Sequence, residues 1–218
     1  DFISIPDLLS CDTRSWDGAN IAKAYFDDVV PHLRAMDFDF TKELPIKDKL
    51  REYNIKEVLV VEGDPPQSML YQVYPTISTD IIKKFSEEMP EITVYAGIDQ
   101  YRSSMKEEEY RIRRKQLAGA KGFFTQPFFD MRYLEMYADL LDGLDIYWGV
   151  SPVLSERSVS YWRNKNNVIF PKDFEPTLEW NIEFASKVID FARKHNHNVY
   201  LMPIKAKIMP YLEGVFAK

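Results

Sequence analysis

One short segment combines residues that could perform chemistry with residues that would hold them in place. Glu62, Gly63 and Asp64 are followed by two prolines, and they come directly after an apolar run. The glycine allows the backbone to turn off the end of a strand, and the prolines stiffen the exit. This arrangement would hold the Asp64 carboxylate beside a ligand, although an Asx-type turn that only closes the loop explains the same residues equally well.

A second candidate, Gln126, lies in the aromatic segment 123–130. Its amide can both donate and accept hydrogen bonds, which suits the polar edge of a pterin or another heterocycle. The alternative is a helix start in which Asp130 is the N-cap and Phe128 and Phe129 belong to the core. That alternative explains these three residues fully and accounts less well for Gln126.

Residues 102–121 form a basic cluster in which seven Lys or Arg side chains accompany three glutamates. Such a cluster could bind the phosphates of a nucleotide cofactor. The spacing of Glu107 with Arg111 and of Glu109 with Arg113 instead indicates ion pairs on a solvated helix face. We favour that second interpretation for the two arginines.

The histidines and the cysteine point to no metal site. His32 ends an apolar strand, where a lone histidine is usually structural, and His195 and His197 are expected in a surface turn. Cys11 is the single cysteine, so it forms no intrachain disulfide. With only three histidines, we predict no bound metal.

The composition excludes several classes of protein. The chain is 45% hydrophobic and 28% charged with a net charge of −6, which argues against binding to nucleic acid or to an anionic membrane. It contains no long apolar run and no signal segment, so we expect a cytoplasmic protein. A homo-oligomer is left open.

Strand-like runs alternate with amphipathic helical segments along the whole chain. The predicted strands are 2–5, 29–33, 57–61, 92–96, 122–125, 145–150 and 198–202, and the predicted helices are 16–27, 42–53, 77–88, 104–118, 131–142, 175–195 and 206–216. This alternation predicts a parallel α/β fold, and the lack of a GxGxxG turn favours a (β/α)8 TIM barrel over an open nucleotide-binding sheet. With no linker in the sequence, we expect one domain spanning 1–218.

In a barrel the active site lies at the carboxyl ends of the strands. The residues that follow the predicted strands are polar and mixed in charge, and they suit a ligand rich in heteroatoms. They include no nucleophile paired with a base. Seven strands, the first already under way at residue 2, suggest that the eighth lies upstream of Asp1.

Several segments, in order along the chain, resemble the methylenetetrahydrofolate reductase family. The matching segments are 1–5, VPHL at 30–33, VVEGDPP at 60–66, VYA at 94–96, 118–130 with its TQPFFD, and GVSPV at 149–153. The resemblance implies a TIM barrel that reduces 5,10-methylenetetrahydrofolate to 5-methyltetrahydrofolate with NAD(P)H, through FAD or by direct hydride transfer. Its partner would be the folate substrate, and its general acid would lie on the strand upstream of Asp1.

The resemblance also implies roles for individual residues. Asp64 matches the aspartate that stabilises positive charge on the folate, and Gln126 matches the glutamine that binds the pterin. The matched flavin-side positions are His32, Gly63, Tyr95, Arg114 and Lys115, the last two meeting the FAD phosphates.

Three matched positions carry residues that are unusual for the family. Glu62 and Asp99 stand at flavin-side positions, and Glu156 stands at a substrate position. Because the flavin side is altered, a folate- or pterin-binding protein of the same fold without redox activity is the alternative function. A barrel enzyme acting on an unrelated anionic substrate is a third reading.

Overall fold

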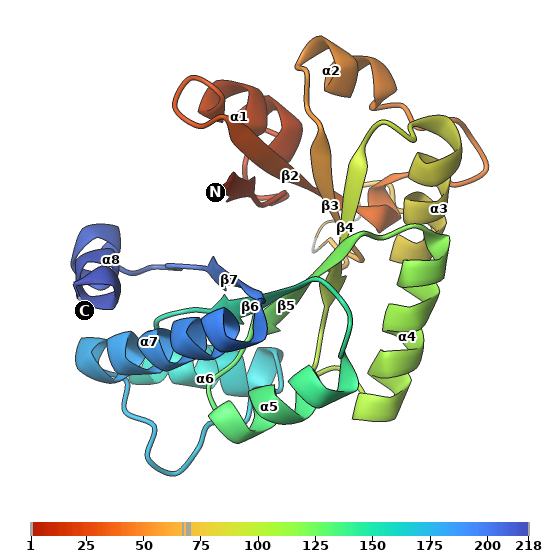
Figure 1. Cartoon of the computed structure of the whole chain (residues 1–218). Helices are drawn as coiled ribbons and strands as arrows, with labels where there is room; N and C mark the ends of the chain where they lie inside the picture. The colour runs from red at the N-terminus through yellow and green to blue at the C-terminus, as the bar shows by residue number, and fades with distance from the viewer. Residues whose placement is uncertain (1, 67, 69–70, 218) are drawn as a thin grey trace. The chain divides into compact units, whose positions relative to one another are not determined.

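The structure, a computed structural model, describes residues 2–66, 68 and 71–217 (Figure 1). The chain divides into two compact units. The first unit comprises Asp1–Gly97 with Ile112–Gly122, and the second comprises Ile98–Arg111 with Phe123–Lys218. The long helix α4 (Met105–Ala118) begins in the second unit and ends in the first.

The first unit is a parallel sheet whose strands follow one another in chain order. Its strands are β1 (Phe2–Ile5), β2 (Asp28–Arg34), β3 (Glu57–Val61) and β4 (Thr93–Ile98). Its other elements are α1 (Ser15–Ala22), the 3₁₀ turn η1 (Ala35–Asp37), α2 (Lys47–Glu52) and α3 (Ser78–Glu88). Parallel strands need such helical crossovers between them.

The two faces of this sheet differ in chemistry. Side chains alternate between the faces of a strand, so Leu33 and Val60, which pair in register, share one fully buried face. The opposite face carries polar side chains, including Ser4, His32 and Arg34. Any chemistry of this unit is therefore confined to one face.

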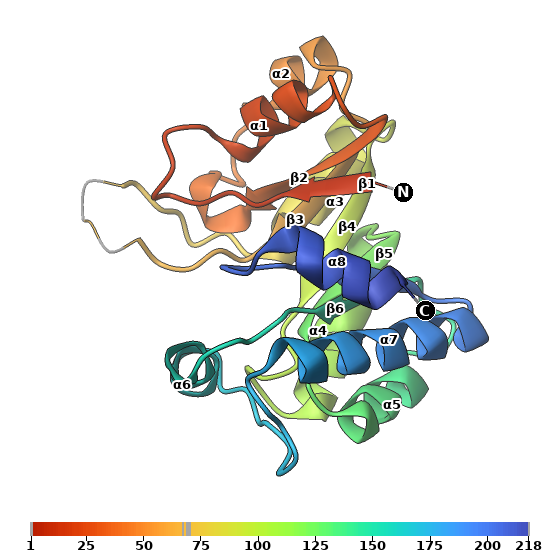
Figure 2. The same ribbon diagram turned by 90° about the vertical axis from the view of Figure 1, so that its left-hand side faces the viewer.

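The second unit contains β5 (Gly122–Pro127), β6 (Ile146–Val150) and β7 (Asn198–Leu201), again parallel and in chain order. Its helices are α5 (Met131–Leu140), α6 (Glu156–Lys165), α7 (Leu178–His195) and α8 (Ile208–Phe216). Figure 2 shows α5 and α7 on the same side of these strands. Their core centres on the fully buried Trp148, which makes edge contacts with Phe128 and Phe191.

The predicted strands and helices are confirmed, with differences at their ends. The helix predicted over 42–53 begins only at Lys47, because Pro45 disfavours helical backbone at the residue before it. Helix α6 was not predicted. Its start is fixed by Ser155, whose side chain accepts a hydrogen bond from the Ser158 amide, and Val159 and Trp162 form its short buried stripe.

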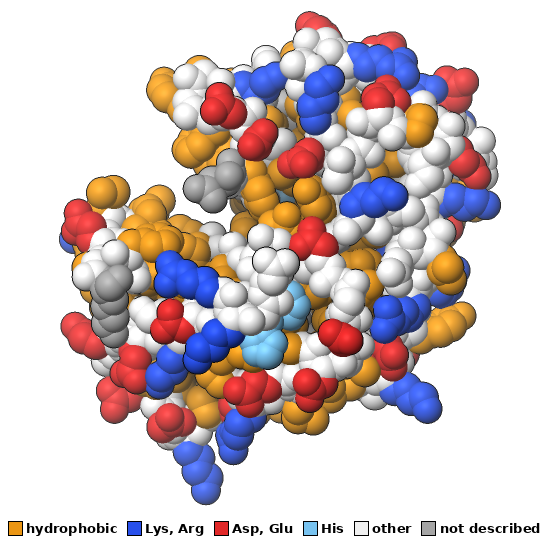
Figure 3. Space-filling view, viewed as in Figure 1, with side chains coloured by type: hydrophobic (Ala, Val, Ile, Leu, Met, Phe, Trp, Pro, Cys, Tyr) orange, Lys and Arg blue, Asp and Glu red, His pale blue; other side chains and the backbone are white. Residues whose placement is uncertain are grey.

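The parallel α/β class is confirmed, whereas closure into an eight-stranded barrel and a single domain stay predictions. Acidic and basic side chains are interspersed over the face drawn in Figure 3. Within the part of the chain that the structure describes, no helix has both the length and the apolarity to cross a membrane.

Candidate functional site

A cluster of charged side chains lies at the carboxyl ends of β1 and β2 in the first unit. Its innermost member is Asp7, whose side chain is only 1% exposed. The Asp7 carboxylate accepts hydrogen bonds from Arg14 Nε at 3.0 Å and Nη2 at 2.6 Å, and from the Ser15 amide at 3.1 Å. A buried carboxylate needs such partners, so Arg14 and the start of α1 are fixed by Asp7.

The cluster continues outward as an alternating chain of acids and arginines. Arg14 Nη2 also donates to Asp37 at 2.7 Å, and Asp37 lies 3.4 Å from Arg34 Nε. Burial lowers the pKa of the Arg14 guanidinium, but the hydrogen bonds and charges of Asp7 and Asp37 outweigh burial and raise it. Arg14 stays one-third exposed, and its Nη1 has no hydrogen-bond partner among the described residues.

Arg34 connects this series of ion pairs to the loop after β3. Its Nη2 donates to the backbone carbonyl of Asp64 at 2.8 Å. Gly63 has a φ of +88°, and a Cβ placed there would lie 3.1 Å from the Arg34 Cβ. Glycine is therefore required for both the turn and the close approach. The exposed Asp64 carboxylate has no partner among the described residues.

Next to the cluster, Ser4 and His32 form a hydrogen-bonded pair. Ser4 Oγ lies 2.5 Å from His32 Nε2. Burial lowers the pKa of His32 to about 4, opposed in part by the charge of Asp7. The ring is therefore neutral at physiological pH. Its Nδ1 has no hydrogen-bond partner within the described ranges. Ser4 lies within β1 and not among the residues that follow the strands, so the sequence did not single out this pair.

Other predicted site residues of the first unit have structural partners. Glu62 accepts hydrogen bonds from the amide and hydroxyl of Ser78, at 3.1 and 2.7 Å, and so caps α3. The Tyr95 hydroxyl donates to Glu57, the first residue of β3, and thus points away from the carboxyl ends of the strands. Lys115 is buried and donates to the Gly97 carbonyl at 2.7 Å. Arg114, on the same helix, is exposed.

The remaining predicted residues belong to the second unit. Asp99 accepts from the Tyr101 amide and from Arg102 Nε, which makes a local turn. Glu156 is exposed at the first position of α6. Gln126 is half-buried on β5, and its side chain has no partner among the described residues.

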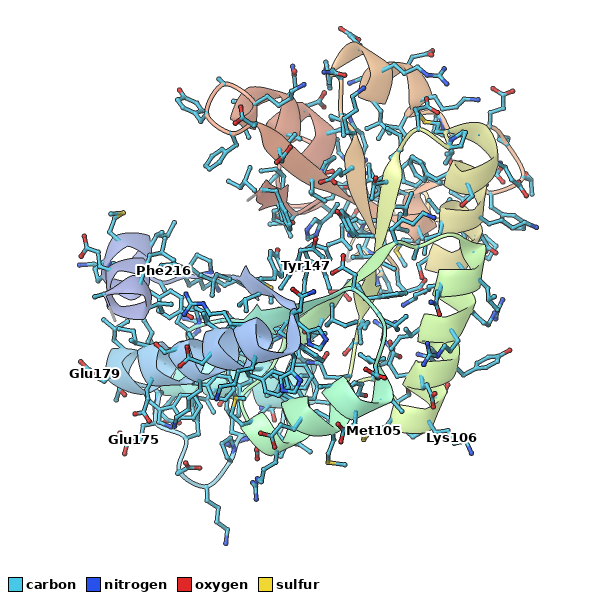
Figure 4. The ribbon with its side chains drawn as sticks, viewed as in Figure 1. Met105, Lys106, Tyr147, Glu175, Glu179 and Phe216 are labelled. Atoms are coloured by element: carbon cyan, nitrogen blue, oxygen red, sulfur yellow. The ribbon has the colours of Figure 1, made fainter. Side chains whose placement is uncertain are left out.

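The backbone of Gln126 is held by a residue that the sequence did not single out. Gln100 Nε2 donates to the Gln126 carbonyl at 2.7 Å, and Gln100 Oε1 accepts from the Gln126 amide at 3.0 Å. Here the pairing of β5 with β6 shifts register between Phe124 and Pro127. Before the shift, the Phe124 ring stacks on the Tyr147 ring with their centroids 4.2 Å apart. Figure 4 labels Tyr147 on β6.

Three structural interpretations of the sequence are confirmed. Asp130 caps α5 by accepting from the Arg132 amide, and Phe128 and Phe129 are buried. Arg111 pairs with Glu107 at 2.7 Å on α4, whose first turn carries Lys106 (Figure 4). The other predicted pair, Glu109 with Arg113, does not form among the described residues, because Arg113 Nη1 donates to Gln116 at 3.4 Å.

The described residues contain no group of three His, Cys, Asp or Glu side chains arranged as metal ligands. Asp7 and Asp37 bind Arg14, and Glu62 binds Ser78. These carboxylates do not form the open set of oxygen ligands that a divalent cation requires.

No family model matches the sequence. The 5,10-methylenetetrahydrofolate reductase of Buchnera aphidicola (subspecies Schizaphis graminum) is 22% identical over 147 residues, which are 65% of this chain and 50% of that protein. The chain therefore spans about half the length of the curated relative that it matches.

Solved structures of two enzymes share the fold over most of the chain. The crystal structure of 2,3-dimethylmalate lyase, a member of the PEP mutase/isocitrate lyase superfamily, matches with a TM-score of 0.57 at 12% identity, covering 91% of this chain and 61% of that one. Oxaloacetate acetylhydrolase with the product oxalate matches with a TM-score of 0.51 at 11% identity, covering 92% and 72%. At this identity the likeness establishes the fold.

These findings correct the functional prediction. The prediction of an oxidoreductase that reduces 5,10-methylenetetrahydrofolate with FAD and NAD(P)H is wrong, since the structures that share the fold are a lyase and an acetylhydrolase and the reductase similarity is weak. The folate- or pterin-binding alternative depended on the same resemblance and is dropped with it.

Proposed function

We propose that the chain carries the active site of an α/β-barrel enzyme that cleaves a small hydroxy or oxo organic acid. The site is the cluster at the carboxyl ends of β1, β2 and β3 in the first unit. The observation that carries the proposal is the one-third exposed Arg14 guanidinium. Its Nη1 is unbonded among the described residues, while its other nitrogens are fixed by the buried Asp7 and the partly buried Asp37.

Arg14 supplies the binding of the acid. A guanidinium held rigidly by two carboxylates is preorganised to receive the carboxylate of a ligand, and it stays charged at all physiological pH values. Its position also fits the fold, because barrel enzymes bind their substrates at the carboxyl ends of the strands.

Asp64 supplies the base. Its exposed carboxylate lies on the loop that Arg34 and Gly63 hold against the cluster. It takes the proton of the substrate hydroxyl while a carbonyl forms and the adjacent carbon–carbon bond breaks. The electron pair of that bond stays on the released carbon as an enolate, which takes a proton from water, and the hydroxide left behind takes the proton back from Asp64. An oxo acid such as oxaloacetate first adds water to its ketone, and the resulting hydrate supplies the hydroxyl.

The similarity to a lyase and an acetylhydrolase of the same fold supports this reaction class, and the names of those enzymes suggest probes. The 22% similarity to a methylenetetrahydrofolate reductase is, in this proposal, a sign of distant common ancestry and not of shared activity.

The first test is binding and turnover of 2,3-dimethylmalate and oxaloacetate by the purified chain, with oxalate as a non-cleavable probe. We expect each acid to raise the Tm in a concentration-dependent way, as a ligand of the native state must. Arg14→Lys should weaken binding, whereas Arg51→Lys, an exposed arginine paired with Glu91, should leave it unchanged. Absence of any Tm increase with all three acids would overturn the proposal.

The second test addresses the base. Asp64→Asn should reduce kcat far more than it lowers the Tm, and Asp12→Asn, at an exposed position with no hydrogen-bond partner among the described residues, is the matched control. Equal losses of activity and stability in Asp64→Asn would show that the residue only closes its loop.

A further inference from the structure

The Ser4–His32 hydrogen bond joins β1 to β2, although these two residues are not opposite each other in the strand pairing. Ser4 lies opposite Val30 in the pairing of β1 with β2, two residues before His32 on the same face. Its hydroxyl therefore reaches along the strand to meet the imidazole at Nε2. The backbone at His32 is fixed separately, because its carbonyl accepts a hydrogen bond from Ser15 Oγ at 2.5 Å.

The position of the ring proton decides which partner donates. A serine hydroxyl can donate or accept, and in a neutral imidazole one nitrogen accepts while the other carries the proton. When the Ser4 hydroxyl donates to His32 Nε2, the proton therefore lies on Nδ1.

The surroundings keep the ring neutral. Burial disfavours the imidazolium, and the one charged group that favours it, Asp7, already receives Arg14 and the Ser15 amide. On its own strand the ring shares a face with Arg34, another cation. Nδ1 has no hydrogen-bond partner among the described residues, so a proton on this nitrogen would be available to a ligand.

We propose that Ser4 is a positioning residue that fixes neutral His32 in the tautomer with its proton on Nδ1, so that the ring donates a hydrogen bond to an oxygen of the organic acid. This role rests on the proposed function. It gives His32 the part of an electrophile in that reaction. A neutral imidazole that donates to a carbonyl or enolate oxygen stabilises the negative charge that develops there.

The test is nitrogen NMR of the uniformly ¹⁵N-labelled chain. The sequence has only three histidines, so long-range ¹H–¹⁵N correlation resolves each ring, and His32→Gln assigns the signals. We expect His32 at pH 7 to show a protonated Nδ1 and an unprotonated Nε2. Ser4→Ala should give a mixture of tautomers, and Ser4→Thr, which keeps the hydroxyl, should restore the single form. His195 should be unaffected.

Oxalate binding supplies the second readout. If Ser4→Ala leaves about one-fifth of the rings in the binding tautomer, the Kd should rise by about fivefold, with recovery in Ser4→Thr. Ser10→Ala, an exposed serine in the loop after β1, is the control. A proton on Nε2 in the unaltered chain, or tautomers unchanged by Ser4→Ala, would overturn the role of Ser4.

The two proposals fail differently. If the tautomer is as expected and no organic acid binds, the proposed function is overturned and the tautomer-fixing role of Ser4 is supported. If the acids bind and His32 carries its proton on Nε2, the positioning role is overturned and the proposed function is supported.

Discussion

The two units close the carboxyl ends of their strands with different chemistry. In the first unit the ends of β1 and β2 carry an ionic chain from Asp7 through Arg14 and Asp37 to Arg34. In the second unit the end of β5 is held by neutral groups. Gln100 pairs with both backbone groups of Gln126, and the Tyr101 hydroxyl donates to the Pro127 carbonyl at 2.9 Å.

The charged groups of the first unit can respond to a ligand or to pH, whereas the neutral network of the second unit only holds the backbone in place. Charged groups at a strand end can receive an anion or transfer a proton, but each depends on its partner to remain buried. A neutral network offers little chemistry, and its strength is almost independent of pH and salt. Tyr137, which also faces the Gln100 carbonyl, has its pKa raised by burial and so stays protonated. We therefore place reactivity in the first unit and rigidity in the second.

The largest effect should come from breaking the ionic chain at its buried end. Arg14→Met leaves the Asp7 carboxylate without its main partner and should cost about 3–5 kcal/mol of stability. Equilibrium denaturation, with hydrogen exchange of peptides from each unit, measures the loss and locates it in the first unit. Arg51→Met, which breaks an exposed pair, should cost about 0.5 kcal/mol.

A second substitution tests whether charge is the cause. Adding Asp7→Asn to Arg14→Met removes the unpaired charge and should recover part of the loss. If the double variant is no more stable than Arg14→Met, packing of the arginine stem and not the buried carboxylate accounts for the effect.

Breaking the neutral network should have a smaller effect. Gln100→Leu removes both side-chain bonds to the Gln126 backbone and should cost about 2–3 kcal/mol, localised by hydrogen exchange to peptides of the second unit. Gln116→Leu, at an exposed glutamine whose side chain accepts a hydrogen bond from Arg113, is the control. The loss of stability in Gln100→Leu should be the same at low and high salt, unlike the loss in Arg14→Met. A salt-dependent loss would contradict the division between the units.

The sequence indicated the fold better than the site. Alternating apolar runs and amphipathic segments are local patterns, so every strand could be predicted. Asp64 and Gly63 could be singled out because a turn signal follows a strand in the same segment. Ser4 and Arg14 could not, because their partners His32 and Asp37 lie 28 and 23 residues away and become neighbours only when β1 pairs with β2. Gln100 was hidden for the same reason, since its partner Gln126 belongs to the next strand.

Most of the pH dependence of stability between pH 6.5 and 4 should also belong to the first unit. The folded-state pKa of His32, about 4, lies below the ordinary value of 6.5, so the unfolded chain takes up this proton more readily. Stability should therefore be complete above pH 6.5 and fall by about 2 kcal/mol as the pH drops toward 4. His32→Gln should remove most of this slope in unfolding experiments, and the remainder should come from His197 of the second unit, whose pKa is also lowered by burial.

Glu88 provides an internal comparison in a separate pH range. Burial raises its pKa, but hydrogen bonds from Lys84, the Leu44 amide and Lys47 outweigh burial and lower it to about 2. Its contribution should be lost between pH 4.5 and 2 and should amount to about 1 kcal/mol for this partly exposed group. Glu88→Gln should remove that lower slope and leave the one between pH 6.5 and 4 unchanged. If His32→Gln alters only the lower slope, the assignment of the two ranges is wrong.

The smallest effect should come from a single neutral hydroxyl in the second unit. Tyr133 donates to the Gln100 carbonyl at 2.6 Å, and Tyr133→Phe removes that bond while keeping the ring contacts with Phe128 and Tyr137. We expect a loss of about 1 kcal/mol, equal at pH 7 and pH 4 because neither partner titrates in that range. Tyr161→Phe, at a half-exposed tyrosine of α6, should be neutral in the same denaturation experiment. A loss for Tyr133→Phe that changes with pH would mean that the second unit shares the electrostatics of the first, and the division of labour between them would have to be abandoned.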